Sequence, residues 1–209
     1  MKRRLLPALA LVLAAGCNTS VAAGHSGPVL FENNCSQCHG AMGQGDANAK
    51  APNIAGLPDW YVLKQVQGFR EGLRGQHYDD IQGMRMRPMA LTLTSDDEVA
   101  AVSKHIASLP RVNAPPTLTG GDAAKGAQYY AVCTACHGPE GKGNQDLGSP
   151  PLVGGTDWYL LNQLDHFKRG IRGTHPKDER GAQMRPMAMT LPDEQAMKDV
   201  LAHVATLSK

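Results

Sequence analysis

The chain has 209 residues, enough for one large domain or two small ones. Its aromatic content of 5% is low for two cores built from side chains alone, so each small domain would need something further to stabilise it. The formal net charge is +2, but Lys2, Arg3 and Arg4 supply this excess, and 18 basic residues face 19 acidic ones in the remainder. Because the chain also has no basic run, nucleic acid is excluded as an expected partner.

Residues 1–23 are interpreted as a signal peptide rather than as part of the fold. Basic residues begin the segment, an apolar stretch from Leu5 to Ala15 follows, and small residues precede Gly24. The apolar stretch is short for a membrane span, so we expect export, cleavage and a periplasmic mature protein. An alternative stays open, because Cys17 follows small residues as in a bacterial lipoprotein signal. A lipid anchor at Cys17 would allow peripheral membrane association.

Three helices are predicted in the first half of the exported chain. They are expected over residues 28–34, 60–69 and 96–109. Apolar residues recur at helical spacing in the second of them, and Ser95 with Glu98 forms a capping box at the start of the third. The stretches 40–56 and 72–85 have the composition of loops, and the second one leads into the string M-R-P-M-A at residues 86–90.

Between the first two predicted helices, residues 35–39 read CSQCH, the C-x-x-C-H attachment signature of a c-type haem. Two thiols at this spacing can bond the two vinyl groups of one haem, and the histidine is then held against the iron as its proximal ligand. The pentad recurs as CTACH at residues 133–137. Two disulfides or a zinc site with four thiolates would not explain why histidine follows each pair. The predicted haem-attachment residues are Cys35, Cys38, Cys133 and Cys136, with His39 and His137 as iron ligands.

A second domain is expected over residues 122–209, after a first over 24–110 and a linker rich in proline and glycine over 111–121. The second half repeats the first at a constant offset of 98 residues, with no gap from the pentad onward. Matched pairs include Pro52 with Pro150, Gln65 with Gln163, Arg74 with Arg172 and Leu109 with Leu207. Since each copy has its own pentad, we predict two covalently bound haem c groups in a mostly α-helical fold.

Methionine is the candidate for the second axial position of each iron. In each half, a methionine lies 47 residues after the histidine of the pentad and begins the string M-R-P-M-A. A methionine ligand favours a high reduction potential and electron transfer. A repeated methionine with polar neighbours, expected in a loop, favours ligation over the filling of a core. The predicted ligands are Met86 and Met184, and the alternatives are Met89 and Met187.

Other repeated residues are assigned lesser roles. His77 and His175 could make bis-histidine haems but are interpreted as loop histidines, and His105 and His203 as packing residues. His166 has no repeat partner and is given no role. The carbonyl groups at Pro52 and Pro150 are expected to accept the ring N–H of the proximal histidines. Basic residues around the methionine strings fit either solvated loops or pairing with haem propionates and a positive docking rim; they are Arg70, Arg74, Arg85, Arg87, Lys168, Arg169, Arg172 and Arg185.

The chain resembles the diheme c4-type cytochromes over residues 27–209. The resemblance rests on both pentads, on the two P-x-x-x-G segments that begin at Pro52 and Pro150, and on a tyrosine four residues before each of Gln65 and Gln163. It implies two class I cytochrome c domains, haems that face one another across the domain interface, and electron delivery to a terminal oxidase. In this family, the methionine seven residues before the leucine that precedes the last helix is the axial ligand, which supports the two methionines predicted above.

The resemblance is incomplete in the first helix of the first domain. The second half has Gly126 and Tyr130, a pair typical of this helix, whereas the first half has Pro28 and Glu32 at the 98-residue offset. The sequence therefore leaves open how the first and last helices of the first domain pack together.

The predicted function is that of an exported diheme electron carrier in a respiratory chain, with no enzymatic activity. The expected redox partners are a quinol-oxidising complex and a terminal oxidase. One alternative is a diheme enzyme of the peroxidase or thiosulfate dehydrogenase type, and another is a cytochrome subunit of a membrane oxidoreductase tethered through Cys17. An enzyme of that kind needs one iron with a displaceable or unusual ligand, and the near equality of the two halves argues against this asymmetry.

Overall fold

The computed structural model describes residues 26–207, and the predicted signal peptide and Cys17 lie outside them. This part of the chain is helical and has no strand beyond two isolated bridges. The helices are α1 (Gly27–Asn34), α2 (Ser36–His39), α3 (Asp59–Arg70), α4 (Ile81–Leu91), α5 (Asp96–Ser108), α6 (Ala123–Tyr130), α7 (Thr134–His137), α8 (Asp157–Arg169), α9 (Glu179–Met189) and α10 (Glu194–Leu207). None of these helices has the length and apolar character needed to cross a bilayer.

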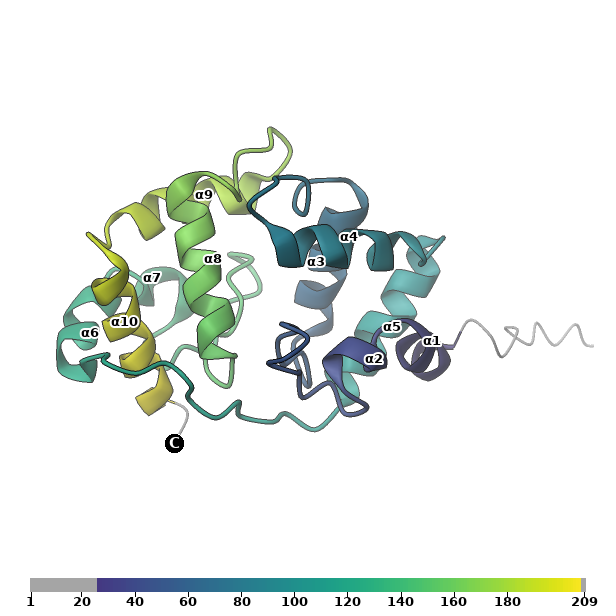
Figure 1. Ribbon diagram of the computed structural model, residues 1–209, viewed down its shortest axis with the longest axis horizontal. Coiled ribbons are helices and arrows are strands. Elements are labelled where there is room, and N and C mark those ends of the chain that lie inside the picture. Colours follow the sequence, from purple (N-terminus) through teal and green to yellow (C-terminus); the bar gives the residue numbers. More distant parts are fainter. Residues whose placement is uncertain (1–25, 208–209) are drawn as a thin grey trace, which may run out of the picture.

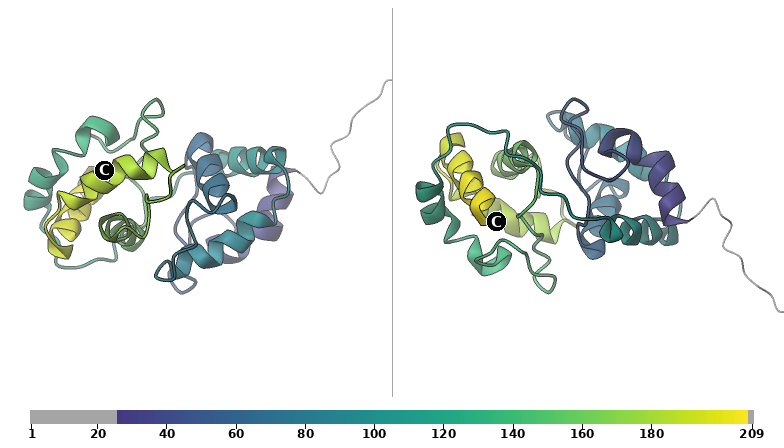
Figure 2. Two further views of the ribbon diagram at one scale, coloured as in Figure 1. Left: turned by 90° about the horizontal axis from the view of Figure 1, so that it is seen from above. Right: turned by 90° about the horizontal axis from the view of Figure 1, so that it is seen from below.

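Helices α1 to α5 form one bundle and α6 to α10 form another, and the two bundles lie side by side (Figures 1 and 2). The segment between α5 and α6 contains no helix and runs along one edge of both bundles (Figure 1). The loops between α3 and α4 and between α8 and α9 meet at the opposite edge. The bundles are therefore joined covalently at one edge and touch through loops at the other.

Local capping explains where the predicted helices begin. The Ser95 hydroxyl accepts the N–H of Glu98 at 3.2 Å, and the Glu98 carboxylate accepts the N–H of Ser95 at 3.3 Å, which makes the predicted capping box of α5. The Asp122 carboxylate likewise accepts two N–H groups at the start of α6. The Ser95 cap confirms the predicted start of the helix expected over 96–109, and the Asp122 cap fixes the start of α6.

The prediction that the M-R-P-M-A strings lie in loops is wrong, because they form most of α4 and α9. The carboxylates of Asp80 and Asp178 accept the N–H groups of Gly83 and Gly181, each at 2.9 Å, and so start the two helices. A Cβ atom on Gly83 would lie 2.0 Å from the Asp80 carboxylate, so the cap requires glycine three residues later. The internal glycine and proline gave these segments the composition of a loop although the cap makes them helical.

Each domain has a small apolar core between its first helix, its last helix and the helix that follows the haem-attachment loop. In the first domain the buried residues include Leu30, Phe31, Val66, Phe69, Val99, Val102 and Ile106; in the second they include Tyr130, Leu191, Met197, Val200 and Val204. Few aromatic side chains take part, as the composition predicted, and the walls of the haem pocket adjoin these cores.

Close contact between the first and last helices corrects the offset used for the first helix. A Cβ atom on Gly27 would lie 2.3 Å from the carbonyl oxygen of Ala101, and one on Gly126 would lie 1.9 Å from that of Asp199. Each glycine therefore marks a point where two helix backbones meet.

Rings one turn later make the equivalent contact in both domains. The Phe31 and His105 ring centroids are 5.2 Å apart, and so are those of Tyr130 and His203. The first domain thus has the same glycine and aromatic pair at an offset of 99, because one extra residue precedes its pentad. The apparent departure at Pro28 and Glu32 came from aligning this helix one residue out of register.

Candidate functional site: two matched haem pockets

The two pentads form the short helices α2 and α7. In each, the histidine N–H bonds to the carbonyl oxygen of the first cysteine at 2.9 Å, so the two thiols and the ring are held within one turn. Cys38 and Cys136 are exposed, Cys35 and Cys133 are half-buried, and none of the four is in a disulfide among the described residues. Within residues 26–207, no three Cys, His, Asp or Glu side chains come together as a group that could hold a metal ion.

The environment of the thiols argues against a redox-active C-x-x-C site. Burial, with a smaller contribution from Cys38, raises the pKa of Cys35 to about 11. Burial likewise raises the pKa of Cys133, ahead of the effect of Cys136. Reactive cysteines have lowered pKa values because the thiolate is the nucleophile. The half-buried thiol of each pentad is therefore unsuited to thiol–disulfide exchange.

The two histidine rings are held in the same way. Nδ1 of His39 lies 2.8 Å from the carbonyl oxygen of Pro52, and Nδ1 of His137 lies 2.8 Å from that of Pro150. Donation of the Nδ1 proton leaves Nε2 with the lone pair that binds a metal, which confirms the predicted role of the proline carbonyl groups. Burial lowers the pKa of both histidines more than this hydrogen bond raises it, so both rings are neutral at neutral pH.

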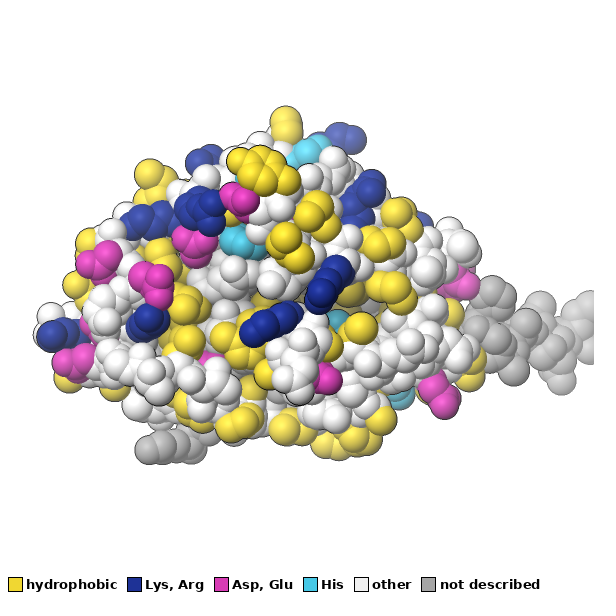
Figure 3. Space-filling view, in the orientation of Figure 1, with side chains coloured by type: hydrophobic (Ala, Val, Ile, Leu, Met, Phe, Trp, Pro, Cys, Tyr) yellow, Lys and Arg dark blue, Asp and Glu magenta, His cyan; other side chains and the backbone are white. Residues whose placement is uncertain are grey.

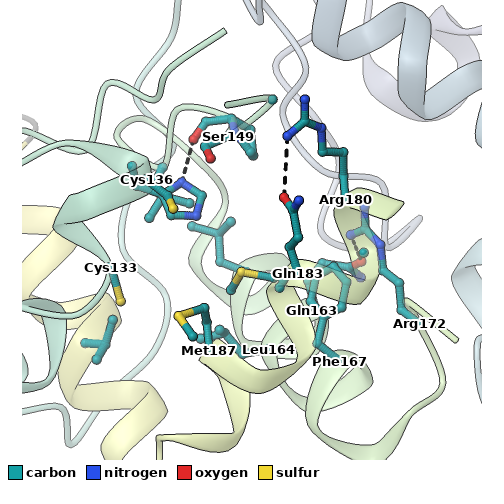
Figure 4. Close-up of a pocket in the computed structure, with 18 of the residues that line it drawn as sticks. Cys133, Cys136, Ser149, Gln163, Leu164, Phe167, Arg172, Arg180, Gln183 and Met187 are labelled. Carbon is teal, nitrogen blue, oxygen red and sulfur yellow. Dashed lines mark hydrogen bonds between the residues drawn. The ribbon is translucent and has the colours of Figure 1, made fainter. Parts of the chain in front are cut away.

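In the second domain, His137 lines a pocket together with both thiols of its pentad and with Met184 and Met187 of α9. Figure 4 shows Cys133 and Cys136 on one side of this pocket and Met187 and Gln183 on another. Apolar side chains form the walls, including Leu152, Leu164, Phe167, Leu191, Val200 and Val204. Tyr61 and Gln65 of the first domain also line it, so the pocket faces the domain interface.

The methionines differ in their exposure. Met86 is partly buried against the core of the first domain, and Met184 is half-buried in the matching place. Met89 and Met187 are 39% and 38% exposed. Because an axial ligand must point into the protein, the burial favours the first pair. The assignment stays a prediction, since Met184 and Met187 both line the pocket.

At the interface, buried Arg74 and half-buried Arg172 each bind glutamines of both domains. Arg74 donates from Nη1 to Oε1 of Gln65 at 2.6 Å and from Nη2 to Oε1 of Gln163 at 3.2 Å. Arg172 donates to Gln163 at 2.6 Å and to Gln65 at 2.8 Å. Nη2 of Arg74 also lies 3.2 Å from the hydroxyl of Tyr159. The resulting polar cluster follows the internal repeat and lies beside the haem pocket of the second domain.

Comparison with known proteins identifies the family. The sequence profile of cytochrome c matches residues 25–110 and 123–208. The chain belongs to the cytochrome c family. It does so as two tandem domains, and the predicted fold class is confirmed.

Individual relatives agree with this assignment. A thiosulfate dehydrogenase electron acceptor from Stutzerimonas stutzeri is 34% identical over 180 residues, which cover 81% of this chain and 78% of that protein. The FixP subunit of a cbb3-type cytochrome c oxidase from Bradyrhizobium diazoefficiens is 36% identical over 157 residues, covering 69% of this chain and 52% of that protein. The crystal structure of reduced cytochrome c4 from Pseudomonas stutzeri has a TM-score of 0.66 and 25% identity, covering 85% of this chain and 95% of that one.

These findings confirm the resemblance to the diheme c4-type cytochromes. The cytochrome carries two covalently bound haem c groups and belongs to a group of electron-transfer proteins. Its relatives indicate that it exchanges electrons with redox partners, without specifying which ones.

Within residues 26–207, arginine Nε atoms that are buried and lack hydrogen-bond partners show that the residues present suit a haem. The Nε atoms of four arginines are buried and have no hydrogen-bond partner in the described part of the chain: Arg74, Arg87, Arg172 and Arg185. They form two repeat-related pairs. The guanidinium of Arg74 stacks 4.2 Å from the Phe69 ring centroid, and that of Arg172 stacks 4.6 Å from Phe167. Because a buried donor needs an acceptor, these atoms fit the carboxylates of haem propionates.

The other basic residues and histidines considered above lie elsewhere. Arg70 pairs with exposed Asp96 at 2.8 Å, and Lys168 donates to the carbonyl oxygen of Leu191. On the face shown in Figure 3, basic side chains are interspersed with acidic and apolar ones. His77 and His175 accept backbone N–H groups in loops, and neither lines the pocket of the second domain.

Sequence reasoning missed His166 and Asp80. The His166 ring is buried at the domain interface, with Nδ1 3.7 Å from Oδ1 of Asp80. His166 was passed over because Gly68 stands at the matching place in the first domain. Its spacing from Tyr159 and Gln163 puts all three on one face of α8, and this could have indicated burial.

Proposed function

We propose that this cytochrome is an exported, periplasmic electron carrier of a respiratory chain that delivers electrons to a terminal oxidase. The main observation is that both domains carry the same complete set of groups: two thiols, an imidazole held by a proline carbonyl, and a half-buried methionine on a capped helix. A diheme carrier needs irons that keep both of their axial ligands, and two matched sets of ligand residues meet this need. The names of the relatives, an electron acceptor and an oxidase subunit, support a place between an oxidising enzyme and an oxidase.

In this proposal each domain, 24–110 and 122–209, holds one haem through its own pentad. Cys35, Cys38, Cys133 and Cys136 form the thioether bonds, and His39, Met86, His137 and Met184 are the iron ligands. When bound, the haem supplies one-electron chemistry between Fe(III) and Fe(II). The carbonyl groups of Pro52 and Pro150 keep each imidazole neutral and fixed in orientation.

The residues between the domains bring the two pockets together. Arg74 and Arg172 would neutralise propionates through Nε while their Nη atoms bind Gln65 and Gln163. Arg74 and Gln163 are buried, and Arg172 and Gln65 are half-buried, so the cluster is largely shielded from solvent. The arrangement suits electron passage from one domain to the other within one chain.

Three further details of the proposal concern the electron donor, the enzyme alternative and membrane attachment. A quinol-oxidising complex would reduce the cytochrome, although the Stutzerimonas relative suggests a thiosulfate-oxidising enzyme as a second kind of donor. A diheme enzyme is disfavoured because it needs one unusual iron site, and the two sites match. Membrane attachment through Cys17 would instead suit a fixed oxidoreductase subunit, and the mass of the mature N-terminus distinguishes the two forms.

Spectroscopy and turnover of the purified diheme protein test this function. We expect two low-spin haems, no carbon monoxide binding at rest, and no reduction when thiosulfate is added alone. We also expect reduction by a quinol-oxidising membrane fraction and reoxidation by an oxidase-containing one. One high-spin haem, or reduction by thiosulfate without a second enzyme, would overturn the carrier assignment in favour of an enzyme.

A further inference from the structure

The domain interface is tied firmly at its linker edge. Arg111 of the linker donates to the carbonyl oxygen of Gly56 at 3.2 Å and to that of Val153 in the other domain. The N–H of Asn53 donates to the Thr156 hydroxyl of the second domain at 2.9 Å. With the covalent connection at the same edge, these bonds make it the natural hinge for any relative motion of the domains (Figure 1).

Two cross-domain pairs of ionisable side chains meet at the other edge: Asp79 forms an ion pair with Arg169 at 2.5 Å, and Asp80 faces His166. Nδ1 of His166 lies 3.7 Å from Oδ1 of Asp80, and the two side chains are only 4% and 6% exposed. Nδ1 of His166 is buried and has no hydrogen-bond partner in the described part of the chain. Asp80 is fixed as the cap of α4, and His166 belongs to the last turn of α8. Each group is therefore held by its own domain, and their separation reports on how closely the domains dock.

Charged groups surround His166 from every element packed against it. Besides Asp80 at the start of α4, these are Asp165 on its own helix, Arg74 in the loop after α3, and Arg172 in the loop after α8. Burial is the largest influence and lowers the pKa of His166; the two carboxylates raise it, and the two guanidiniums lower it further. The net effect lowers the pKa, so His166 is neutral at neutral pH while the domains are docked.

The contact breaks the symmetry of the repeat. Gly68 stands where His166 would be expected in the first domain, so Asp178, the partner of Asp80, has no matching histidine on α3. The polar cluster of Gln65 and Gln163 is duplicated, whereas this pair occurs once at the interface. The neighbouring ion pair between Arg169 and Asp79, 2.5 Å long, also occurs once, with Glu71 and Lys177 at the repeat positions of its members. Of these side chains, His166 is the one whose ordinary pKa lies near neutral pH.

We propose that His166 and Asp80 form a pH-sensitive contact that keeps the domains docked while His166 is neutral and releases their outer edge when His166 takes up a proton. An imidazolium there would be buried beside two guanidiniums and would face one carboxylate already engaged in a helix cap. Separation about the linker edge hydrates the cation. Because the docked form binds the proton less readily, acid shifts the population toward the open form. The further expectation that opening slows electron passage between the haems rests on the proposed function.

Two measurements on the reduced diheme protein test the contact directly. The Cε1–H NMR signals of the histidines are followed from pH 4.5 to 8, with the His166→Asn variant assigning the signal of interest. We expect His166 to titrate below the ordinary histidine pKa of about 6.5. The Asp80→Asn variant keeps a side-chain oxygen to cap α4 but removes the charge, so it should lower the His166 pKa further.

Small-angle X-ray scattering at pH 7.5 and 5 then measures opening. We expect the wild type and a His175→Asn control to expand in acid, and His166→Asn to keep the same maximum dimension at both pH values. Titration of His166 at or above the ordinary histidine pKa of about 6.5, or equal acid expansion of His166→Asn and wild type, would overturn the proposal. Neither readout depends on a redox partner, so these results stand apart from the proposed function.

Discussion

Arg74 and Gln163 belong to different domains, yet Nη2 of Arg74 lies 3.2 Å from Oε1 of Gln163. The reverse contact, from Arg172 to Gln65, is 2.8 Å long. Each guanidinium also binds the glutamine of its own domain, so each amide oxygen accepts from two arginines. Since buried cationic donors need acceptors, separating the domains would leave these groups without partners unless water replaced them. The interface is therefore held by polar contacts that both domains must complete.

Replacing Gln163 by leucine tests this interpretation. The change removes the acceptor of one Nη atom of Arg74, in a buried hydrogen bond, and of one Nη atom of Arg172, in a partly buried one. We expect the free energy of unfolding to fall by about 1–3 kcal/mol, because unsatisfied buried donors keep their desolvation penalty. Urea unfolding of the diheme protein measures the change. The exposed Gln145→Leu variant is the control and should stay within about 0.5 kcal/mol of wild type; equal loss in both variants would contradict the role of the amide.

Much of each domain could be predicted from the sequence because its signals are local. The pentads carry their chemistry in five residues, and the Ser95 capping box and the Asp122 cap lie within a few residues of the helices they start. The proline carbonyl groups that hold the imidazoles were predictable from the repeat, which placed Pro52 and Pro150 at matched positions beyond each pentad.

Features that depend on docking could not be predicted in this way. The contact of Arg74 with Gln163 joins residues 89 positions apart, and no local pattern specifies it. His166 lacked a repeat partner because it serves an asymmetric contact, so reasoning from the repeat discarded it. The helix α4 was missed for a different reason: its cap, Asp80, lies at the end of a glycine-rich loop and its interior contains Pro88.

Alanine in place of Gly27 or Gly126 tests the register of the first helices. The new Cβ atoms would lie 2.3 Å and 1.9 Å from backbone carbonyl oxygens of the last helices, so the helices must separate. We expect each variant to lose at least about 1–3 kcal/mol of stability in thermal or urea unfolding. The Gly68→Ala control places its Cβ 3.8 Å from the nearest side chain and should be tolerated. Tolerance of Gly27→Ala together with damage from Pro28→Ala would contradict the one-residue shift.

A carboxylate that joins α6 to α10 predicts one part of the acid sensitivity. Asp199 accepts the N–H of Asp122 at 2.8 Å and the side-chain amide of Gln195 at 2.8 Å, and these hydrogen bonds lower its pKa. A lowered pKa means that the stabilisation is present above the unfolded value of about 4 and is lost as the pH falls through the folded one. Asp199→Asn should therefore lose less stability than wild type between pH 5 and 3 in urea unfolding. The exposed Asp146→Asn control should follow the wild type, and a parallel loss in Asp199→Asn would refute the assignment.

The axial ligands are tested by the weak absorption band that a methionine–iron bond gives in the oxidised protein. Met86→Ala and Met184→Ala should each remove about half of this band, because one of two methionine-ligated irons is lost each time. In a redox titration, the affected haem should also move to a lower potential, since methionine ligation raises it. Met89→Ala and Met187→Ala are matched controls on the same helices, more exposed than the predicted ligands, and should keep the full band. Loss of the band in these controls, with the band intact in the first pair, would transfer the ligand role to the second methionine of each string.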